Sequence, residues 1–425
     1  MSFRVAIVGA GWAGLAAAVA AHSRGHAVTL FEAARTPGGR ARTVPVPLPD
    51  GSTASLDNGQ HILIGAYVET LALMETVGVD PHDVLLRLPL VLQDPQGRGI
   101  ALPLWPAPLD AFGGILAARG WSWGDKLSLL RAAVGWQLSG FRCAPELTVD
   151  DLTARIAPRV RAEMIEPLCV SALNTPAARA SGQVFLRVLR DSLFGRGHRD
   201  WGSSNLLLPK QDLGRLLPHA AAAWLQREGV DLRVGARVQA LRREGEQWDV
   251  DGERFDRVVL AAPSLEAARL VEDSGAEAGD WVSAARSLDF EAITTVYAIG
   301  GPRLPQPMLA LHSAPGAPAQ FVFDRGQLGG PAGLLAFVVS ASPRERAQVE
   351  AEVVAQAASL GWQVQPLQTV VEKRATFACL PGLRRPPLTI APGLWACGDY
   401  VEGPYPATLE GAVRSGLAVA GMLGG

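Results

Sequence analysis

The sequence predicts an α/β fold in which a parallel sheet covered by helices is interleaved with a second domain of mixed helix and sheet. Three observations support this prediction. An apolar strand leads through a glycine-rich turn into a helix near the N-terminus, the middle of the chain changes to long helical patterns, and apolar strands return towards the C-terminus. A chain of 425 residues is also too long for one hydrophobic core, which favours two domains.

The first elements of the chain form a βαβ unit. Arg4–Val8 is a short apolar strand, Trp12–Ser23 is a helix, and Ala27–Phe31 is a second buried strand. Two strands joined in this way through a helix lie parallel in one sheet and are connected by a right-handed crossover. The N-terminal segment therefore begins the parallel sheet.

Different patterns follow along the chain. Residues 101–200 contain long helical patterns such as Lys126–Leu138, and we expect them to form a helical insertion. Strands and helices alternate again after Leu206, from a helix at Leu213–Glu228 to a closing helix at about Thr408–Leu423. Between these two helices we expect strands at Leu232–Val234, Trp248–Val250, Arg257–Ala261, Thr294–Ile299, Gln320–Phe323, Leu334–Val339 and Leu394–Cys397, and a helix at Pro343–Leu360.

The composition argues against nucleic acid and metal as partners. A net charge of −2, without a basic stripe, gives no general attraction to a phosphate backbone. The seven histidines show no metal-ligand spacing, so we expect no metal site. Val5–Ala21 is apolar enough to resemble a signal peptide, but glycines interrupt it and its first part is typical of a strand. We therefore expect a cytoplasmic protein that does not span a membrane.

The turn between the first strand and the first helix has the spacing G-x-G-x-x-G at residues 9–14. Gly9 permits the tight turn, Gly11 lets the backbone approach a pyrophosphate, and Gly14 allows the helix to pack closely on the strand. The helix that begins there directs free N–H groups and the positive end of its dipole at the phosphates. Glu32, at the end of the second strand, can accept both hydroxyls of an adenosine ribose. These features predict a dinucleotide site but do not separate NAD from FAD.

Three further segments indicate FAD. Pro37–Arg40 reads P-G-G-R, in which the glycines let the backbone pass close to a cofactor and Arg40 can bind a phosphate bidentately. Leu394–Asp399 is an apolar strand followed by Gly-Asp, and Glu410–Ala412 reads E-G-A near the C-terminus. Together, these segments resemble the amine oxidase and phytoene desaturase superfamily of flavoproteins.

This resemblance implies a two-dinucleotide-binding-type, Rossmann-like FAD domain interleaved with a substrate domain. It implies that Asp399 lies beside the ribityl and pyrophosphate groups, and that the N–H of Leu409 faces the N1/O2 edge of the flavin. It further implies that Leu232–Leu241 is a strand pair that carries the adenine. The FAD-binding residues expected from the motifs and the resemblance are Gly9, Ala10, Gly11, Ala13, Gly14, Glu32, Ala33, Gly39, Arg40, Gly59, Gln60, His61, Val238, Gly398, Asp399, Thr408 and Leu409. The FAD domain is expected to comprise residues 1–100, 201–285 and 385–425, and the substrate domain residues 101–200 and 286–384.

A narrower resemblance rests on three longer blocks. Asp57–Tyr67 reads D-N-G-Q-H-I-L-I-G-A-Y, Trp201–Pro209 reads W-G-S-S-N-L-L-L-P, and Gly398–Thr408 reads G-D-Y-V-E-G-P-Y-P-A-T. These blocks resemble the bacterial hydroxysqualene dehydroxylase family, also called squalene-associated FAD-dependent desaturases, and the resemblance covers essentially the whole chain. It implies removal of the hydroxyl group from hydroxysqualene to give squalene, within hopanoid or related triterpenoid biosynthesis.

Loss of an allylic hydroxyl requires a proton for the departing water and a hydride for the allylic carbon. The resemblance places His61 near the flavin ring, where it either donates the proton or orients the flavin through a hydrogen bond. Tyr405 is the second candidate for the catalytic proton donor. Asp57 is expected to hold the turn together and not to act on the substrate.

A long polyprenyl substrate is insoluble in water, so we expect it to reach the enzyme from a membrane or a partner enzyme. Pro108–Ile115 and Trp121–Trp136 are candidates for a peripheral contact with the cytoplasmic membrane. The tryptophans of residues 101–142 either fit an apolar substrate or pack ordinary helices. They are Trp105, Trp121, Trp123 and Trp136. No second glycine fingerprint for NAD(P)H is evident, so we expect a separate electron donor.

Three other functions are compatible with parts of the sequence. An oxidative desaturase of a carotenoid precursor or another polyprenyl chain needs the same apolar tunnel. An amine oxidase is disfavoured because members of that superfamily often sandwich the amine between two aromatic side chains; Tyr405 supplies one, but Thr408 stands at the other position. A prenyl-binding escort protein without flavin is disfavoured by the intact Gly398–Asp399 and Glu410–Ala412 elements.

Overall fold

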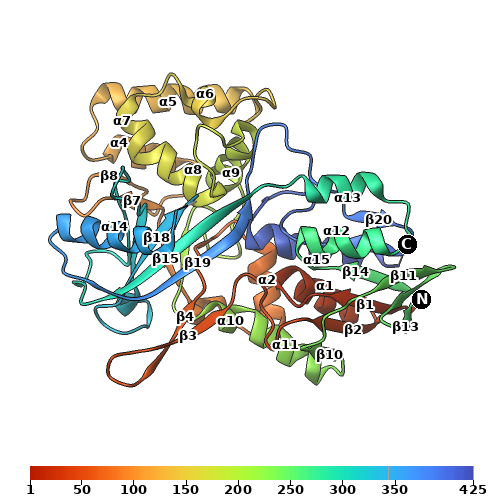
Figure 1. The fold of residues 1–425 in the computed structure, drawn as a ribbon. Helices are drawn as coiled ribbons and strands as arrows, with labels where there is room; N and C mark the ends of the chain where they lie inside the picture. The colour runs from red at the N-terminus through yellow and green to blue at the C-terminus, as the bar shows by residue number, and fades with distance from the viewer. Residues whose placement is uncertain (343, 425) are drawn as a thin grey trace.

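The computed structural model describes residues 1–342 and 344–424. Figure 1 shows two bodies beside each other. One, near both chain termini, is a sheet covered by helices, and the other is a second sheet beneath a layer of helices. Red, green and blue segments all occur in the first body, so distant parts of the chain interleave to build it.

A six-stranded sheet forms the centre of the first body. Its strand order is β10–β2–β1–β14–β21–β20, and neighbours are parallel except for the pair β20 and β21. Val5 to Val8 of β1 are buried on both faces, as expected for a central parallel strand. The strands are β1 (Arg4–Val8), β2 (Ala27–Glu32), β10 (Asp231–Val234), β14 (Arg257–Leu260), β20 (Thr389–Ala391) and β21 (Leu394–Ala396). The predicted parallel sheet is therefore confirmed, with ends displaced by one residue at most in the strands named from the sequence.

The segment Leu232–Leu241 is not a strand pair, contrary to the prediction. β10 joins β2 in the parallel sheet, whereas β11 (Leu241–Glu244) pairs with β12 (Gln247–Val250), which pairs with β13 (Glu253–Phe255). Gly235, whose φ is +69°, follows β10 directly, and residues 236–240 form an irregular connection. The two strands therefore belong to different sheets.

Helices α1 (Trp12–Ser23) and α15 (Leu409–Met422) pack against each other beside this sheet. A Cβ atom on Gly416 would lie 2.2 Å from the carbonyl oxygen of Ala13, so only glycine permits this approach. α1 is buried on nearly all sides, which explains its lack of a polar face. The predicted helices at residues 12–23 and 408–423 are confirmed.

A five-stranded antiparallel sheet forms the second body. Its order is β16–β17–β18–β15–β19. Helix α14 (Arg346–Ser359) packs on it through Val349, Val353 and Ala357; of the helix predicted at Pro343–Leu360, Pro343 lies outside the described residues. The strands are β15 (Phe290–Ile299), β16 (Met308–Ala310), β17 (Phe321–Asp324), β18 (Leu335–Ser340) and β19 (Gln365–Phe377).

The helical insertion predicted at residues 101–200 is confirmed and forms the outer layer of the second body (Figure 1). Helix α5 begins at Trp123, three residues before the predicted start, because Ser122 and Asp125 form a reciprocal capping box. The helices are α4 (Leu109–Ala117), α5 (Trp123–Leu138), α6 (Val149–Thr153), α7 (Pro158–Val160), the π-helix η1 (Arg161–Ile165), α8 (Glu166–Leu173) and α9 (Gly182–Phe194).

Short elements connect the two bodies. The helix predicted at Leu213–Glu228 is interrupted: Leu217 has φ −144° and ψ −54°, and Pro218 begins a new helix without an N–H to donate. The hairpin β7–β8 lies against β16, so the boundary expected at residue 100 falls inside β8. The remaining strands are β3 (Thr43–Pro47), β4 (Thr53–Asp57), β5 (Leu63–Ile64), β6 (Leu85–Leu88), β7 (Val91–Gln93), β8 (Gly99–Ala101) and β9 (Leu206–Pro209), and the remaining helices are α2 (Val68–Thr76), α3 (Pro81–Val84), α10 (Leu213–Leu216), α11 (Pro218–Arg227), α12 (Ser264–Asp273), α13 (Gly279–Arg286) and η2 (Arg325–Leu328).

Among the residues that the structure describes, none of the helices combines the length and the apolar character that crossing a bilayer requires.

Candidate functional site

One large cavity lies where the two bodies meet, and it encloses about 2440 Å³ including its open mouth. The glycine turn, the end of β2, the turn after β4, α8, the second sheet and the start of α15 all contribute to its wall. The predicted FAD-binding residues that line it are Gly9, Gly11, Ala13, Glu32, Ala33, Gly39, Arg40, Gly59, Gln60, His61, Val238, Gly398, Asp399, Thr408 and Leu409. Segments from both ends of the chain and from its middle therefore meet at one site.

The glycine turn forms one end of the cavity. Gly9 has a φ of +111°, and a Cβ atom there would lie 2.7 Å from the carbonyl oxygen of Ala261. Gly11 caps helix α1 without a side-chain hydrogen bond, so the first N–H groups of the helix are free for an anionic ligand. Ala10 and Gly14 do not line the cavity: Gly14 packs behind the turn, where a Cβ atom would lie 1.9 Å from the carbonyl oxygen of Gly9. The turn fits a pyrophosphate group.

Glu32 lies at the carboxyl end of β2, beside the glycine turn. Its two carboxylate oxygens accept hydrogen bonds from the N–H groups of Ala10 and Ala34, both at 2.7 Å. These bonds fix the carboxylate in the cavity wall, and each oxygen keeps a lone pair that can accept a ribose hydroxyl. Ala10 therefore contributes by positioning Glu32.

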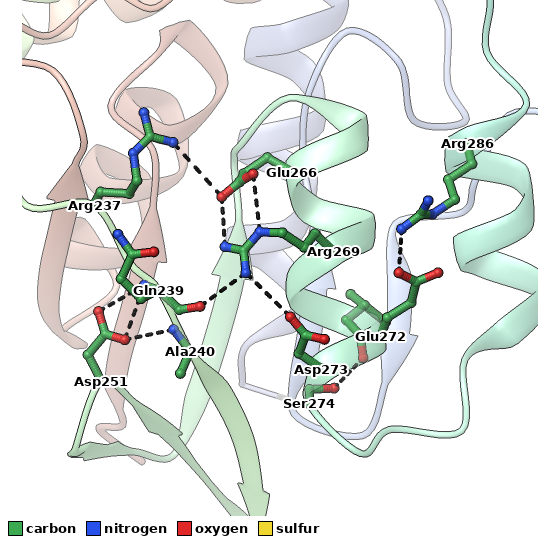
Figure 2. A network of polar contacts seen from close by, with 11 residues as sticks. Arg237, Gln239, Ala240, Asp251, Glu266, Arg269, Glu272, Asp273, Ser274 and Arg286 are labelled. Carbon is green, nitrogen blue, oxygen red and sulfur yellow. Dashed lines mark hydrogen bonds and ion pairs between the residues drawn. The ribbon is translucent and has the colours of Figure 1, made fainter.

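Val238 also lines the cavity and lies on the irregular connection after β10. Arg269 of α12 donates to the carbonyl oxygen of Gln239 at 3.2 Å and to the carboxylate of Glu266 at 2.8 Å. Asp251 accepts the N–H of Gln239 from the other side, at 3.0 Å. Figure 2 shows these contacts side by side, and they hold Val238 in place where the resemblance expects an adenine.

Arg40 and Asp399 form an ion pair in the wall of the cavity. Arg40 also donates to the carbonyl oxygen of Ala375 at 2.8 Å, and its own carbonyl oxygen accepts from Asn58 at 2.5 Å. A guanidinium group has five N–H donors, so the remaining ones can still meet a phosphate. The pair joins the loops after β2 and β21, which are 359 residues apart in sequence.

The turn at residues 57–61 passes along the cavity between the two bodies. Asp57 is 1% exposed; one carboxylate oxygen accepts the N–H of Leu213 at 2.7 Å, whereas the other has no partner among the described residues. Its carbonyl oxygen accepts the hydroxyl of Tyr297 at 2.9 Å. Burial raises the pKa of the Asp57 carboxyl to about 7. Asp57 therefore anchors the turn, as expected from the sequence.

His61 presents one ring nitrogen for chemistry. Nδ1 lies 2.8 Å from the carbonyl oxygen of Gly59, and because a carbonyl only accepts, Nδ1 carries the hydrogen. Nε2 is the nitrogen left for a ligand. Burial lowers the pKa of His61, and the positive charge of Arg40 lowers it further, whereas the bond to Gly59 opposes the change. His61 in this position is a neutral hydrogen-bonding group near neutral pH and, when protonated, a stronger acid than a free imidazolium.

The N-terminus of α15 forms the opposite wall. Thr408 caps the helix by accepting the N–H of Gly411 at 3.0 Å, which leaves the N–H of Leu409 without an intrahelical acceptor. The fully buried carboxylate of Glu410 accepts from the N–H of Thr70 at 2.9 Å and from Nε of Arg414 at 2.6 Å. Because the positive end of the helix dipole is fixed in this way, the wall favours a ligand that develops negative charge.

Tyr405, the second candidate proton donor, is not among the residues that line the cavity. Its ring meets the ring of Tyr67 edge-on at 6.1 Å, and the guanidinium group of Arg414 lies 5.0 Å above it. Tyr67 lines the cavity instead. The sequence offered one signal for Tyr67, namely its place at the end of the block that begins at Asp57.

Apolar side chains line part of the same cavity, and we call this part the apolar chamber. Its lining comes from α8 and from strands β15, β17 and β18, and includes Val170, Ile293, Phe321, Phe323 and Val338. Sequence reasoning had instead considered the tryptophans of residues 101–142 for an apolar substrate, and none of them lines the cavity. Two are buried among helices, Trp121 and Trp136, and two are exposed, Trp105 and Trp123.

The fold and the site define a class of protein. A glycine turn at a helix N-terminus, a fixed carboxylate at the end of the next strand and a second helix N-terminus face one cavity, which includes the apolar chamber. This arrangement is that of an FAD-dependent oxidoreductase. The chain matches the model of the flavin containing amine oxidoreductase family over residues 12–423, and it belongs to that family.

Curated relatives narrow the comparison. The chain is 27% identical to a hydroxysqualene dehydroxylase of Rhodopseudomonas palustris, over 100% of this chain and 99% of the relative. It is 25% identical to a hydroxysqualene dehydroxylase of Sinorhizobium fredii, over 99% of this chain and 98% of that protein. A zeta-carotene desaturase of Synechocystis is 43% identical, but over 18% of this chain and 14% of its own length.

Solved structures share the fold. An oxidoreductase from Methanosarcina mazei superposes with a TM-score of 0.74 at 16% identity, covering 98% of this chain and 99% of its own. A putrescine oxidase bound to putrescine has a TM-score of 0.70 at 16% identity, covering 100% of this chain and 99% of its own. The family and these neighbours show that FAD is the cofactor of the present chain. The interpretation of the chain as an escort protein without flavin is therefore wrong.

Proposed function

We propose that the enzyme removes the hydroxyl group of hydroxysqualene reductively to give squalene, a step of hopanoid or related triterpenoid biosynthesis. The observation that carries this proposal is the full-length similarity to hydroxysqualene dehydroxylases, whose names state that reaction. The apolar chamber of the cavity supports it, because a polyprenyl chain requires a wall without unpaired polar groups.

The site has the two environments that this reaction needs. Phe321, Phe323 and Val338 offer an apolar surface to the chain of the substrate. Gln60, His61 and the positive end of α15 lie on the polar side of the same cavity. Reduced FAD, when bound there, supplies the hydride that replaces the hydroxyl on the allylic carbon. One hydride and one proton convert the alcohol into a hydrocarbon and water, so the residues of the chain must provide the proton.

We propose His61 as the group that handles this proton. Nδ1 is committed to the carbonyl oxygen of Gly59, so Nε2 is the atom available to the hydroxyl of the substrate. Burial lowers the pKa of His61, which makes the protonated ring less abundant near neutral pH but a better acid. The alternative role, orienting the flavin by a hydrogen bond, uses the same nitrogen and is separated from the first by its pH dependence.

Tyr67 is proposed to support the departing hydroxyl. Tyr67 lines the cavity, and burial with the nearby charge of Glu410 raises the pKa of its hydroxyl, so it stays a hydrogen-bond donor over the whole working range. Tyr405 packs against Tyr67 and is proposed to hold it. Tyr67→Phe should then lower turnover while FAD remains bound, and Tyr405→Phe should have the smaller effect. An equal loss in both variants would assign the role to the pair, against this proposal.

An oxidative desaturase of polyprenyl chains is the second candidate, and the partial similarity to zeta-carotene desaturase favours it. An amine oxidase is less favoured: Thr408 stands where a second aromatic side chain would be, and Tyr405 does not line the cavity. In the reductive proposal, electrons come from a separate donor protein. The substrate reaches the cavity from a membrane or from the enzyme that makes it.

Electron flow separates the two main candidates. The purified FAD-loaded enzyme would be assayed without oxygen, with hydroxysqualene and a chemical reductant, and its lipids extracted. The proposal expects squalene at a rate that depends on the reductant. Squalene or a carotenoid precursor consumed with oxygen or a quinone, and no reaction of hydroxysqualene, would establish the desaturase instead.

A further inference from the structure

The outer helices of the second body expose an unusual amount of apolar surface. Of the fourteen large hydrophobic side chains exposed among the described residues, nine lie between positions 104 and 138. They belong to α4, α5 and the loop before α4. Six of them define what we call the apolar face: Trp105, Leu109, Phe112, Trp123, Leu127 and Leu138. An exposed patch of this kind marks an interaction surface, since soluble monomers rarely leave one uncovered.

Helix α5 carries apolar side chains on its outer side as well as on its buried side, unlike an ordinary surface helix. Its buried residues are Leu129 and Trp136, whereas Trp123, Leu127 and Leu138 point outwards at helical spacing. Trp123 is 76% and Leu138 84% exposed, so most of both side chains is open to solvent. The outer side of this helix therefore offers apolar surface to a partner.

The charges around the apolar face are those that suit anionic lipid. Lys126 and Arg131 lie on α5, and the amino group of Lys126 is 5.1 Å from the centre of the Trp123 ring. Two acidic side chains, Asp110 and Asp125, occur in the segment 104–142. Asp110 is buried and accepts the hydroxyl of Ser204, and Asp125 is used in the capping box of α5. Asp125 remains at the surface beside Lys126, so Lys126 and Arg131 together give the face a small excess of positive charge.

These charges decide between a bilayer and a second copy of the chain. In a two-fold interface through α5, Arg131 would be buried near a second Arg131, because it lies on the exposed side of the helix between Leu127 and Leu138. At a bilayer surface, its long side chain reaches up to the lipid phosphates while the apolar neighbours enter the hydrocarbon edge. The geometry therefore favours lipid.

The same layer of helices touches the cavity on its inner side. α5 packs on α7, η1 continues α7 into α8, and Val170 and Ser171 of α8 line the cavity. Figure 1 shows α5 on the outside of this layer and α8 beneath it. A protein docked through α4 and α5 thus has one thin layer of helices between the bilayer and the substrate chamber.

We infer that the apolar face docks the enzyme on the anionic surface of a lipid bilayer. The bilayer would then be the source of the polyprenyl substrate, so this inference rests on the proposed function. Trp121, Trp136 and Ile115 are buried and take no part. Four of the six docking residues lie in the two candidate segments, whereas Trp105 precedes the first segment and Leu138 follows the second. Docking is shallow and peripheral.

The test is flotation of the FAD-loaded protein with vesicles of phosphatidylcholine alone and of phosphatidylcholine with phosphatidylglycerol. The variant Trp123→Glu/Leu127→Glu changes two exposed side chains, and a glutamate at position 123 suits the first turn of a helix, so folding is expected to persist. Met422→Glu, an exposed apolar side chain near the C-terminus, is the matched control. Bound FAD and circular dichroism verify that each variant is folded.

The wild type and Met422→Glu should float with the anionic vesicles. The double variant should bind these vesicles at least about tenfold more weakly than the wild type. Arg131→Gln should lose about fivefold in binding to anionic vesicles and little in binding to neutral ones. Absence of flotation of the wild type, or equal flotation of the double variant, would overturn the inference. So would a wild-type dimer that the double variant converts into a monomer without any lipid binding.

The proposed reaction can fail separately. With hydroxysqualene in detergent micelles, the double variant should match the wild type in turnover, whereas with substrate in anionic vesicles it should be slower. A wild type that floats but converts hydroxysqualene in neither form would refute the reaction and leave the docking surface standing. A double variant that is equally active in both forms would refute the docking surface alone.

Discussion

The pH dependence of stability provides a direct test of the buried Asp57. Its pKa is raised from 3.8 to about 7 by burial, and one carboxylate oxygen has no partner among the described residues. A group whose pKa is higher in the folded than in the unfolded state stabilises the fold fully at a pH below its pKa in the unfolded state. This contribution is lost as the pH rises through its pKa in the folded state. The expected loss is about 2 kcal/mol between pH 5 and pH 7 and about 3 kcal/mol by pH 8, because the slope of about 1.4 kcal/mol per pH unit falls as the pH reaches the folded pKa.

The substitution Asp57→Asn removes the titrating group while keeping an acceptor for the N–H of Leu213. Urea unfolding of both proteins at pH 5 and pH 8, with excess FAD, gives the difference in unfolding free energy at each pH. We expect the wild type to lose about 3 kcal/mol relative to the variant between these two values. Asp50→Asn is the control, because that carboxyl is exposed and its pKa is lowered, so it stays ionised throughout. Parallel changes in the wild type and Asp57→Asn would refute the buried, neutral carboxyl.

Three further predictions concern the cavity walls. Glu410→Gln should lower the free energy of unfolding by about 2–4 kcal/mol, because an amide cannot accept from both Thr70 and Arg414. Glu69→Gln, at the residue before Thr70 on α2, should change it by less than about 0.5 kcal/mol, and equal effects in urea unfolding would contradict the anchoring role. Gly416→Ala should weaken FAD binding in a fluorescence titration because its Cβ would meet the carbonyl oxygen of Ala13 at 2.2 Å, whereas Gly421→Ala on the same helix meets nothing within 4 Å and should bind FAD normally. If His61 donates the proton, turnover of the wild type should rise as pH falls below about 6.5, because the lowered pKa of His61 delays its protonation. His61→Ala should lose this rise while it still binds FAD. Full turnover in His61→Ala would remove His61 from the mechanism.

Local patterns predicted the parts of the site that lie close together in sequence. Gly9, Gly11 and Glu32 belong to one βαβ unit whose geometry follows from strand and helix periodicity, so their meeting in space could be expected. The ion pair of Arg40 and Asp399 joins loops 359 residues apart, and only the resemblance to a superfamily placed both near one cofactor. The pairing of these two side chains with each other was not foreseen.

Other features of the structure also could not be predicted from local sequence patterns. Tyr405 lies next to a recognisable motif, but its backbone φ is +57° and its ring lies against Tyr67 and Arg414. Its role as a proton donor stays a prediction. The strand at Gln365–Phe377 escaped notice because charged side chains interrupt its apolar pattern. Helical spacing in α5 could identify two faces but not which one is buried, so Trp123 and Trp136 were indistinguishable before the fold was known.

A single turnover of the reduced enzyme tests the central claim most directly. The FAD-loaded protein would be reduced chemically without oxygen, freed of excess reductant and mixed with hydroxysqualene, and the flavin absorbance would be followed while lipid is extracted. The account predicts that squalene forms in an amount equal to the bound FAD, in step with reoxidation of the flavin. FAD that stays reduced, with hydroxysqualene recovered unchanged, would contradict it.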